Sequence, residues 1–126
     1  MLRLLFGFEG RVNRARYWLF HIGAALAIAV FWILVIGTVD FATHDPRQRF
    51  AEIRGTVLLT ALPVAIVFLW SALAISVKRW HDRNKSGWWV LIGFVPVIGH
   101  LWFLIECGLL PGTPGPNDYG PDPLAR

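Results

Sequence analysis

Three long apolar intervals dominate the sequence and predict helices that cross a membrane. Residues 17–39 and 55–77 contain no Asp, Glu, Lys or Arg, and residues 86–110 contain a single one, Glu106. Each interval reaches the roughly 20 residues that a helix needs to cross about 30 Å of hydrocarbon. Helices are expected because a backbone in lipid must form its hydrogen bonds within its own segment. The pattern predicts an all-α, polytopic transmembrane protein with about three spans, at residues 17–39, 56–77 and 88–110.

Polar segments flank and separate these intervals within what we interpret as one membrane domain over residues 1–126. The first sixteen residues begin with Leu2, Leu5 and Phe6 on one helical face, which is typical of a short segment lying in the membrane interface. The other polar segments are expected to be a loop at 40–54, a tight basic turn at 78–85 and a Pro/Gly-rich tail at 111–126.

The third interval is the one whose path has an alternative. Pro96, Gly99 and His100 fall near its middle, where a helix could break. A broken helix could dip into the membrane and return, which would put the tail in the cytoplasm. A single crossing is favoured because each half of the interval has only about ten residues, fewer than a span requires.

Composition and charge placement support a membrane protein and indicate its orientation. Hydrophobic residues make up 56% of the chain and charged residues 16%, more apolar surface than a soluble domain of 126 residues could bury. Basic residues at the ends of the apolar intervals orient membrane proteins, with the richer side in the cytoplasm. The N-terminus is therefore expected in the cytoplasm, and no nucleic-acid partner is expected. Eight of the twelve basic residues then lie inside: Arg3, Arg11, Arg14, Arg16, Lys78, Arg79, Arg83 and Lys85.

Three ordered motifs stand out in the polar segments. They read GRVNRARYW at 10–18, RWHDRNKSGWW at 79–89 and PGTPGPNDYGPDP at 111–123. The chain resembles the bacterial inner-membrane family known as domain of unknown function 805, over nearly its whole length. It departs from the family pattern mildly, at Lys78 and Trp80. The resemblance implies a multi-pass protein of the bacterial inner (plasma) membrane, and it implies no biochemical activity because the family has none established.

The arginines of the first two motifs are the main candidate site. Arg11, Arg14, Arg79 and Arg83 could bind a lipid phosphate, since a guanidinium grips phosphate in a bidentate fork. They could also be simple anchors beside the spans. A third interpretation is a structural salt bridge to Asp82 that locks the first span to the second loop, and we favour it slightly over the lipid pocket.

His81, next to Asp82, invites comparison with a general base. Adjacent residues in a turn do not face one another, so a capped turn is the preferred interpretation, with Asp82, Asn84 or Ser86 capping the next helix. No catalytic residue is assigned and the protein is not expected to be an enzyme.

Two ionisable residues fall inside the third interval, and the tail carries a further polar motif. His100 and Glu106 are candidate functional residues because a charge inside a bilayer is energetically costly. Their separation of six residues, however, places them about 120° apart around a helix, so they do not form a pair by themselves. Neither a metal nor another cofactor is expected. The tail's prolines exclude a phosphate-binding loop opening a helix. Its motif residues are Asn117, Tyr119 and Asp122. The tail is expected to form turns packed back against the membrane face, with Asn117 and Tyr119 supplying hydrogen bonds.

These features favour a non-enzymatic membrane module that binds lipid headgroups or a membrane partner through its cytoplasmic arginines. The alternative is a small transporter or channel subunit, which would require a homo-oligomer with His100 and Glu106 along the path. A lipid-modifying enzyme using His81 and Asp82 is the least favoured interpretation. The expected partners are membrane lipids, with a membrane protein or further copies of the chain as the other candidates.

Overall fold

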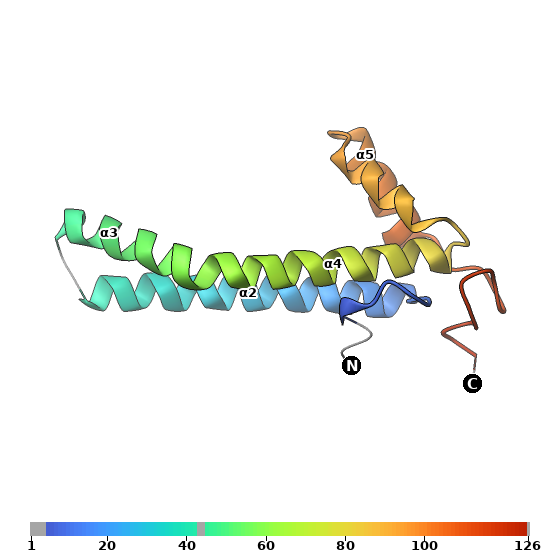
Figure 1. The fold of residues 1–126 in the computed structure, drawn as a ribbon, viewed down its shortest axis with the longest axis horizontal. Coiled ribbons are helices and arrows are strands. Elements are labelled where there is room, and N and C mark those ends of the chain that lie inside the picture. The colour runs from blue at the N-terminus through green and yellow to red at the C-terminus, as the bar shows by residue number, and fades with distance from the viewer. Residues whose placement is uncertain (1–4, 43–44, 126) are drawn as a thin grey trace. The chain divides into compact units, whose positions relative to one another are not determined.

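The structure is a computed structural model that describes the backbone of residues 5–42 and 45–125, and the side chains of these residues except 39–42, 49, 56 and 57. Over this part of the chain all regular elements are helices, with one isolated β-bridge in the tail between Asn117 and Gly120. The elements (Figure 1) are α2 (Arg14–Ala42), α3 (Pro46–Thr56), the π-helix η1 (Val57–Ala61), α4 (Leu62–Asp82), the 3-10 helix η2 (Gly87–Phe94), α5 (Ile98–Phe103) and the π-helix η3 (Leu104–Leu109).

Two helical runs are long and apolar enough to cross a membrane. They are Arg14–Thr38, with 25 residues, and Pro46–Asp82, with 37 residues that include α3, η1 and α4. At 1.5 Å per residue the shorter run is about 37 Å long, which exceeds the hydrocarbon thickness. Ile98–Leu109 is a shorter apolar helix. The predicted fold class, an all-helical polytopic membrane protein, is confirmed.

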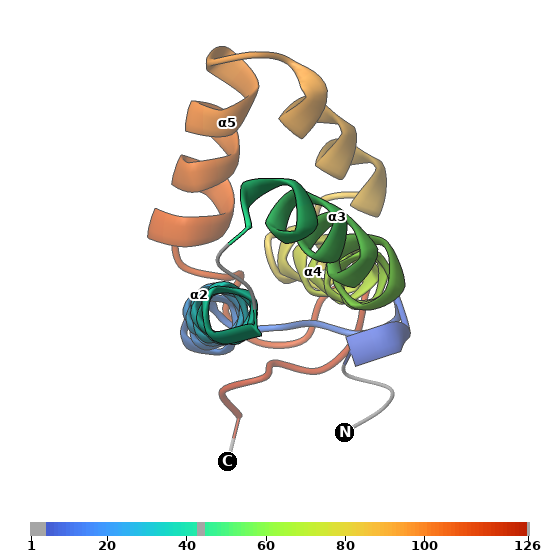
Figure 2. The ribbon, with the colours of Figure 1, turned by 90° about the vertical axis from the view of Figure 1, so that its left-hand side faces the viewer.

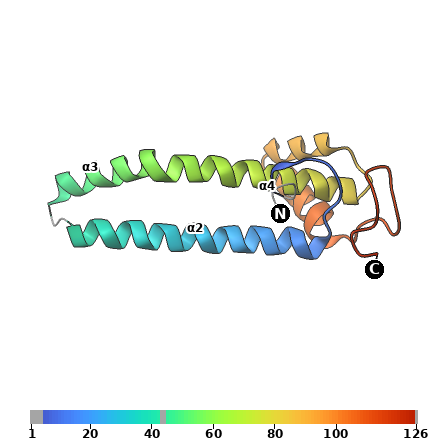
Figure 3. The same cartoon turned by 60° about the horizontal axis from the view of Figure 1, so that its bottom comes forward.

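The chain divides into two units, of which the second is Ile22–Leu69. In this unit the rest of α2 runs antiparallel to α3, η1 and the start of α4 (Figure 3). Val35 is its only buried residue among those whose side chains the structure describes. Large apolar side chains such as Ile33 and Leu59 are exposed, as expected for a hairpin whose solvent is lipid.

The predicted polar loop at 40–54 is wrong for most of its length, because α2 continues to Ala42 and α3 begins at Pro46. Asp45 starts the new helix: its Oδ1 accepts the backbone N–H of Arg47 at 2.9 Å. Proline at the first helical position is favourable because its missing N–H is not needed there. Residues that composition alone assigns to a loop thus begin a helix, because an acidic N-cap residue is followed by proline.

The first unit, Met1–His21 with Trp70–Arg126, contains most of the buried residues. Its apolar core consists of Val12, Tyr17, Ile75, Trp80 and Cys107. The Trp80 ring lies 6.0 Å from that of Trp89 and 5.6 Å from that of Phe103. Leu2 of the predicted interfacial segment lies outside the described residues, whereas Phe8 packs edge-on against Trp70 at 5.3 Å.

Residues 88–110, for which we favoured a single interrupted crossing, form two helical arms that fold back on each other. Figure 2 shows η2 and α5 side by side and antiparallel, joined by a turn at Val95–Val97. A straight helix from Lys85 to Glu106 would separate these two residues by about 32 Å, yet Lys85 Nζ lies 2.6 Å from Glu106 Oε1. The hairpin has the geometry of the re-entrant alternative.

Two residues near the hairpin tip explain why the helix turns back. Pro96 has no N–H to continue the helix, and it favours an extended conformation in the residue before it, as observed for Val95. Gly99 lies so close to Ile92 that a Cβ at position 99 would overlap the Ile92 carbonyl. Glycine therefore permits the close approach of the two arms.

A compact turn connects α4 to the hairpin. Asn84 adopts a positive φ of 55°, Asn84 N–H donates to His81 O at 2.9 Å, and Lys85 N–H donates to Trp80 O at 3.0 Å. This pattern is a Schellman motif, which ends a helix through a left-handed residue. Ser86 then accepts the Trp88 N–H and caps η2. The turn brings the start of the hairpin next to the end of α4.

Candidate functional site: a buried cluster of arginine and aspartate

The three sequence motifs meet around one carboxylate in the first unit. Asp82, at the end of α4, has a side chain only 3% exposed. Its Oδ1 accepts from Arg11 Nε at 3.0 Å, and its Oδ2 accepts from Arg79 Nη1. The first and second motifs are therefore joined by an ion-pair triad, the arrangement of the structural alternative.

Arg11 also binds the third motif. Its Nη1 donates to Gly115 O at 2.6 Å and its Nη2 to Thr113 O at 2.6 Å. Nη1 lies 3.3 Å from a further acceptor, Gly120 O. Every nitrogen of this guanidinium has an acceptor, and the side chain is 1% exposed. Arg11 therefore has no free face for an external phosphate.

A row of side-chain donors binds the end of η3, where a helix leaves its last four carbonyls without partners. Arg79 is fully buried and donates to two of these carbonyls, Cys107 O and Leu110 O. Cationic donors are favoured here because the helix dipole places negative charge at its C-terminus. Five consecutive carbonyls accept side-chain bonds: Cys107 and Leu110 from Arg79, Gly108 from Trp18, Leu109 from Arg14 and Pro111 from Arg83.

Glu106 is buried at the base of the hairpin and forms two ion pairs. Its Oε2 lies 3.1 Å from Arg83 Nε and its Oε1 lies 2.6 Å from Lys85 Nζ. Lys85 Nζ also lies 5.6 Å from the ring centroids of Trp80 and Trp89. Glu106 thus ties the last helical segment to the turn after α4. The His100 side chain, by contrast, is exposed on α5 and has no hydrogen-bond partner among the described residues.

His81 is held by groups from the first and third motifs. Its Nδ1 lies 3.2 Å from Gly10 O, and its ring stacks on Tyr119 with centroids 4.0 Å apart and planes 4° apart. Asn117 Nδ2 donates to His81 O at 2.9 Å. Over the described residues no hydrogen bond joins His81 to Asp82, whose carboxylate is occupied by arginine.

The tail forms a series of turns that pack against the end of α4, a contact that the sequence did not predict. Thr113 binds Asp82 O through its N–H at 2.8 Å and its hydroxyl at 3.1 Å. Gly112 lies so close to Asp82 that an added Cβ would overlap the carboxylate. Asp122 accepts the N–H groups of Leu124 at 2.8 Å and Gly115 at 3.0 Å, and these bonds lower the pKa of its carboxyl.

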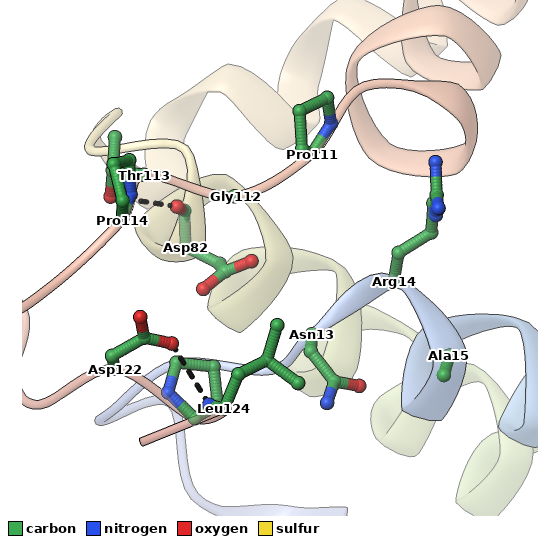
Figure 4. A pocket seen from close by; sticks show the side chains of 11 residues that line it. Asn13, Arg14, Ala15, Asp82, Pro111, Gly112, Thr113, Pro114, Asp122 and Leu124 are labelled. Carbon is green, nitrogen blue, oxygen red and sulfur yellow. Dashed lines mark hydrogen bonds between the residues drawn. The ribbon is translucent and has the colours of Figure 1, made fainter.

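A pocket of about 320 Å³ lies between the tail, the start of α2 and Asp82. Figure 4 shows Arg14 at one side of the pocket, and Asp122 and Leu124 of the tail at the other. Arg14 is exposed, and its Nη1 donates to Leu109 O at 2.8 Å. The pocket is thus lined by an arginine that retains donors, unlike Arg11.

The structure brings together most residues singled out in the sequence. Those in one connected cluster are Arg11, Arg79, His81, Asp82, Arg83, Glu106, Asn117, Tyr119 and Asp122, with Arg14 at its edge. Sequence reasoning missed Trp18, Lys85 and Thr113, each of which bonds to a carbonyl or carboxylate distant in the sequence. The only indication of their importance in the sequence was that they lie inside the three motifs. Among the described residues no group of three His, Cys, Asp or Glu side chains is placed to hold a metal.

Comparisons with known proteins match nearly the whole chain. The family model described as protein of unknown function (DUF805) matches residues 5–121. The chain is 34% identical to the inner membrane protein YhaH of Escherichia coli K12 over 125 residues, covering 98% of this chain and 92% of YhaH.

Two further E. coli K12 proteins are similar. The inner membrane protein YhaI is 34% identical over 98% of this chain and 91% of its own length. The uncharacterized protein YiiR is 29% identical over 94% of this chain and 86% of its own length. No solved structure matches the chain. The family match and the coverage of these relatives show that the chain belongs to the DUF805 family of uncharacterised inner-membrane proteins.

Proposed function

We propose that this protein is a multi-pass, non-enzymatic module of the bacterial inner membrane that binds anionic lipid headgroups through exposed arginines at its cytoplasmic end. The observation that carries the proposal is the division of the first unit's arginines into two groups. Arg11 and Arg79 are buried against Asp82 and backbone carbonyls. Arg14 and Arg16 are exposed on the first turn of α2, where donors can reach a phosphate.

Arg14 is the best-placed of the exposed pair. It lines the 320 Å³ pocket, and apart from the bond to Leu109 O its guanidinium has no partner among the described residues. Guanidinium binds phosphate through two parallel hydrogen bonds. A basic residue near an anionic membrane surface contributes about 1 kcal/mol, so Arg14 and Arg16 together can produce a measurable lipid preference.

The proposed topology has the N-terminus and the tail in the cytoplasm. Basic residues concentrate before α2 and at the turn after α4, the two segments that the positive-inside rule assigns to the cytoplasm. The tail binds the last turn of α4, directly before that turn, through Thr113 and Asn117, which supports a shared side. The hairpin of η2, α5 and η3 would then enter the membrane and return.

The contacts of His81 and Glu106 bear on the other functions. Tyr119 covers one face of the His81 ring and Gly10 O occupies its Nδ1, while arginines occupy Asp82, so this pair is poorly placed for acid–base catalysis. Glu106 is engaged with Arg83 and Lys85, which gives little support to a polar path shared with His100. These contacts favour a binding module over an enzyme or a transporter.

The headgroup proposal is tested by lipid selectivity in reconstituted membranes. Wild-type protein would be placed in phosphatidylcholine bilayers, and its relative affinity for spin-labelled phosphatidylglycerol against phosphatidylcholine measured by electron paramagnetic resonance. We expect a preference for phosphatidylglycerol that Arg14→Gln with Arg16→Gln removes. The matched control is Arg47→Gln with Arg54→Gln, two exposed arginines of the second unit. A preference that survives the first pair, or is absent in the wild type, contradicts the proposal and points to a protein partner.

The topology is tested separately with a C-terminal reporter that is active only on one side of the membrane. A cytoplasmic tail is expected. A periplasmic tail would overturn the proposed path of the hairpin. It would not affect the conclusion from the lipid-selectivity measurement, which is an independent test. Arg16→Gln alone is a useful supplement, because Arg16 makes no side-chain hydrogen bond within the described part of the chain and its loss should not disturb folding.

A further inference from the structure

An apolar groove of about 550 Å³ runs between the end of α4 and η2, and of the connected cluster described above only His81 lines it. On α4 it is lined by Leu73, Val77 and His81, which are spaced one helical turn apart on one face. These three positions extend over about 12 Å of helix. Val90 and Leu91 of η2 form the opposite wall. Ligand sites are typically grooves of this size, mostly apolar with a few polar groups that fix orientation.

The polar groups of the groove lie at one end. His81 is at the last turn of α4, and Ser86 is in the turn that follows it. Among the described residues that line the groove none carries a permanent charge. The groove therefore matches an amphiphile with an apolar chain and an uncharged polar end, and it lacks the cation that a phosphate would need.

The hydrogen-bonding capacity of that end follows from the two side chains. Gly10 O can only accept, so its contact with His81 Nδ1 requires the hydrogen to be on Nδ1. In the neutral ring Nε2 is then an acceptor, and it has no hydrogen-bond partner among the described residues. A Cβ at Gly87, another lining residue, would lie 3.2 Å from this Nε2, which places the atom at the groove wall.

Ser86 complements this acceptor. Its Oγ accepts the Trp88 N–H at 3.4 Å, so its hydroxyl hydrogen remains available for donation. The groove thus offers one acceptor and one donor beside an apolar channel. A ligand that fits must donate to Nε2 and accept from the Ser86 hydroxyl.

We propose that the groove binds one acyl chain of an uncharged glycerolipid of the diacylglycerol class, with its free hydroxyl donating to His81 Nε2 and its ester carbonyl accepting from Ser86. Stacking on Tyr119 and the bond to Gly10 O hold the His81 ring in place for this contact. The glycine at position 87 is needed here because any larger residue would fill the space beside Val77 and His81.

The test uses a dioleoylglycerol analogue with a photoreactive diazirine in one acyl chain, applied to the full-length protein in phosphatidylcholine membranes. The same diazirine chain on phosphatidylcholine is the comparison probe. Mass spectrometry should locate the diacylglycerol label on peptides that contain Leu73, Val77, Val90 or Leu91, and unlabelled dioleoylglycerol should compete. Label of equal yield from both probes, or spread evenly over the apolar faces of α2 and α4, would overturn the proposal.

Two variants and two controls sharpen the result. Leu73→Trp fills the groove and should lower labelling by about fivefold or more, whereas Leu69→Trp, one turn earlier on the same helix and outside the groove, should leave it unchanged. His81→Asn keeps a donor for Gly10 O but removes Nε2, and should lower diacylglycerol labelling about fivefold, the loss of one hydrogen bond. His81→Asn adds no bulk, so it decides the matter if Leu73→Trp fails to assemble.

Undiminished labelling of His81→Asn contradicts the assigned hydrogen bond. Arg14→Gln with Arg16→Gln should leave labelling unchanged, because neither arginine lines the groove. The failure of the headgroup proposal and the failure of this one are therefore separate results.

Discussion

The two units of this protein are built on opposite principles. In Ile22–Leu69 the helical segments over residues 22–39 and 57–69 carry no charged side chain, and within the described side chains of this unit only Val35 is buried. In the other unit the buried set includes Arg11, Arg79, Asp82 and Glu106 beside its aromatic core. Because lipid is as apolar as leucine, burying apolar side chains gives little drive for helices to associate in a membrane. Specific structure at the polar end therefore depends on hydrogen bonds and ion pairs.

The comparison predicts that sensitivity to substitution is concentrated in the first unit, and exchange of Asp82 is the strongest test. Asp82→Asn leaves the guanidinium groups of Arg11 and Arg79 buried without a counter-charge. Breaking a buried pair from one side costs about 3–5 kcal/mol. We expect a large loss of thermal stability in detergent, measured by fluorescence-detected size-exclusion chromatography, and release of the tail to protease. Glu52→Gln, at an exposed acid of α3, is the control. Equal stability of the two variants would contradict a stabilising role for the ion-pair triad around Asp82.

Arg79→Lys should come next. The guanidinium reaches Asp82, Cys107 O and Leu110 O at once, and a single ammonium cannot occupy all three positions. Loss of hydrogen bonds that involve a charged group costs about 1.5–3 kcal/mol. The same assay should show a clear loss, whereas Arg54→Lys at an exposed position of α3 should stay within about 0.5 kcal/mol of the wild type. An Arg79→Lys protein as stable as Arg54→Lys would show that charge alone suffices.

Glycine to alanine exchange gives the same comparison with a single methyl group. At Gly112 the new Cβ would overlap the Asp82 carboxylate, and overpacking of this kind costs about 1–3 kcal/mol. At Gly55 in α3 the Cβ meets open space, and alanine should stabilise the helix by up to about 1 kcal/mol. Opposite signs in the two thermal-stability measurements are expected; two shifts of the same sign would be inconsistent with the tail packing described above.

The smallest expected effect is a pH dependence of the tail. The N–H groups of Leu124 and Gly115 lower the pKa of Asp122 below its ordinary value of 3.8. The folded carboxyl has the lower pKa, so its contribution is complete above the unfolded value and disappears as pH falls through the folded value. Tail protection from hydrogen exchange should thus weaken below about pH 4. Asp122→Asn should remove that dependence; an unchanged profile would assign it to another group.

The extent to which the sequence predicts the structure differs between these two units. Long intervals without charge determined the helices of the second unit, because a helix in lipid satisfies its backbone from within the segment. Helix α3, inside the predicted loop at 40–54, was missed because the N-cap at Asp45 outweighs the polar composition of this segment. In the third interval Pro96 and Gly99 indicated a break, but the path after the break depends on which distant groups bind the last carbonyls.

The sequence by itself therefore determined the helical membrane class, the basic end and the family motifs. The tertiary structure decided that Arg11 reaches Gly115, 104 residues away, and that Asp82 joins all three motifs. A guanidinium can donate hydrogen bonds to any well-placed carbonyl or carboxylate. The residue type states that an arginine needs acceptors, and only the folded chain shows which ones it finds.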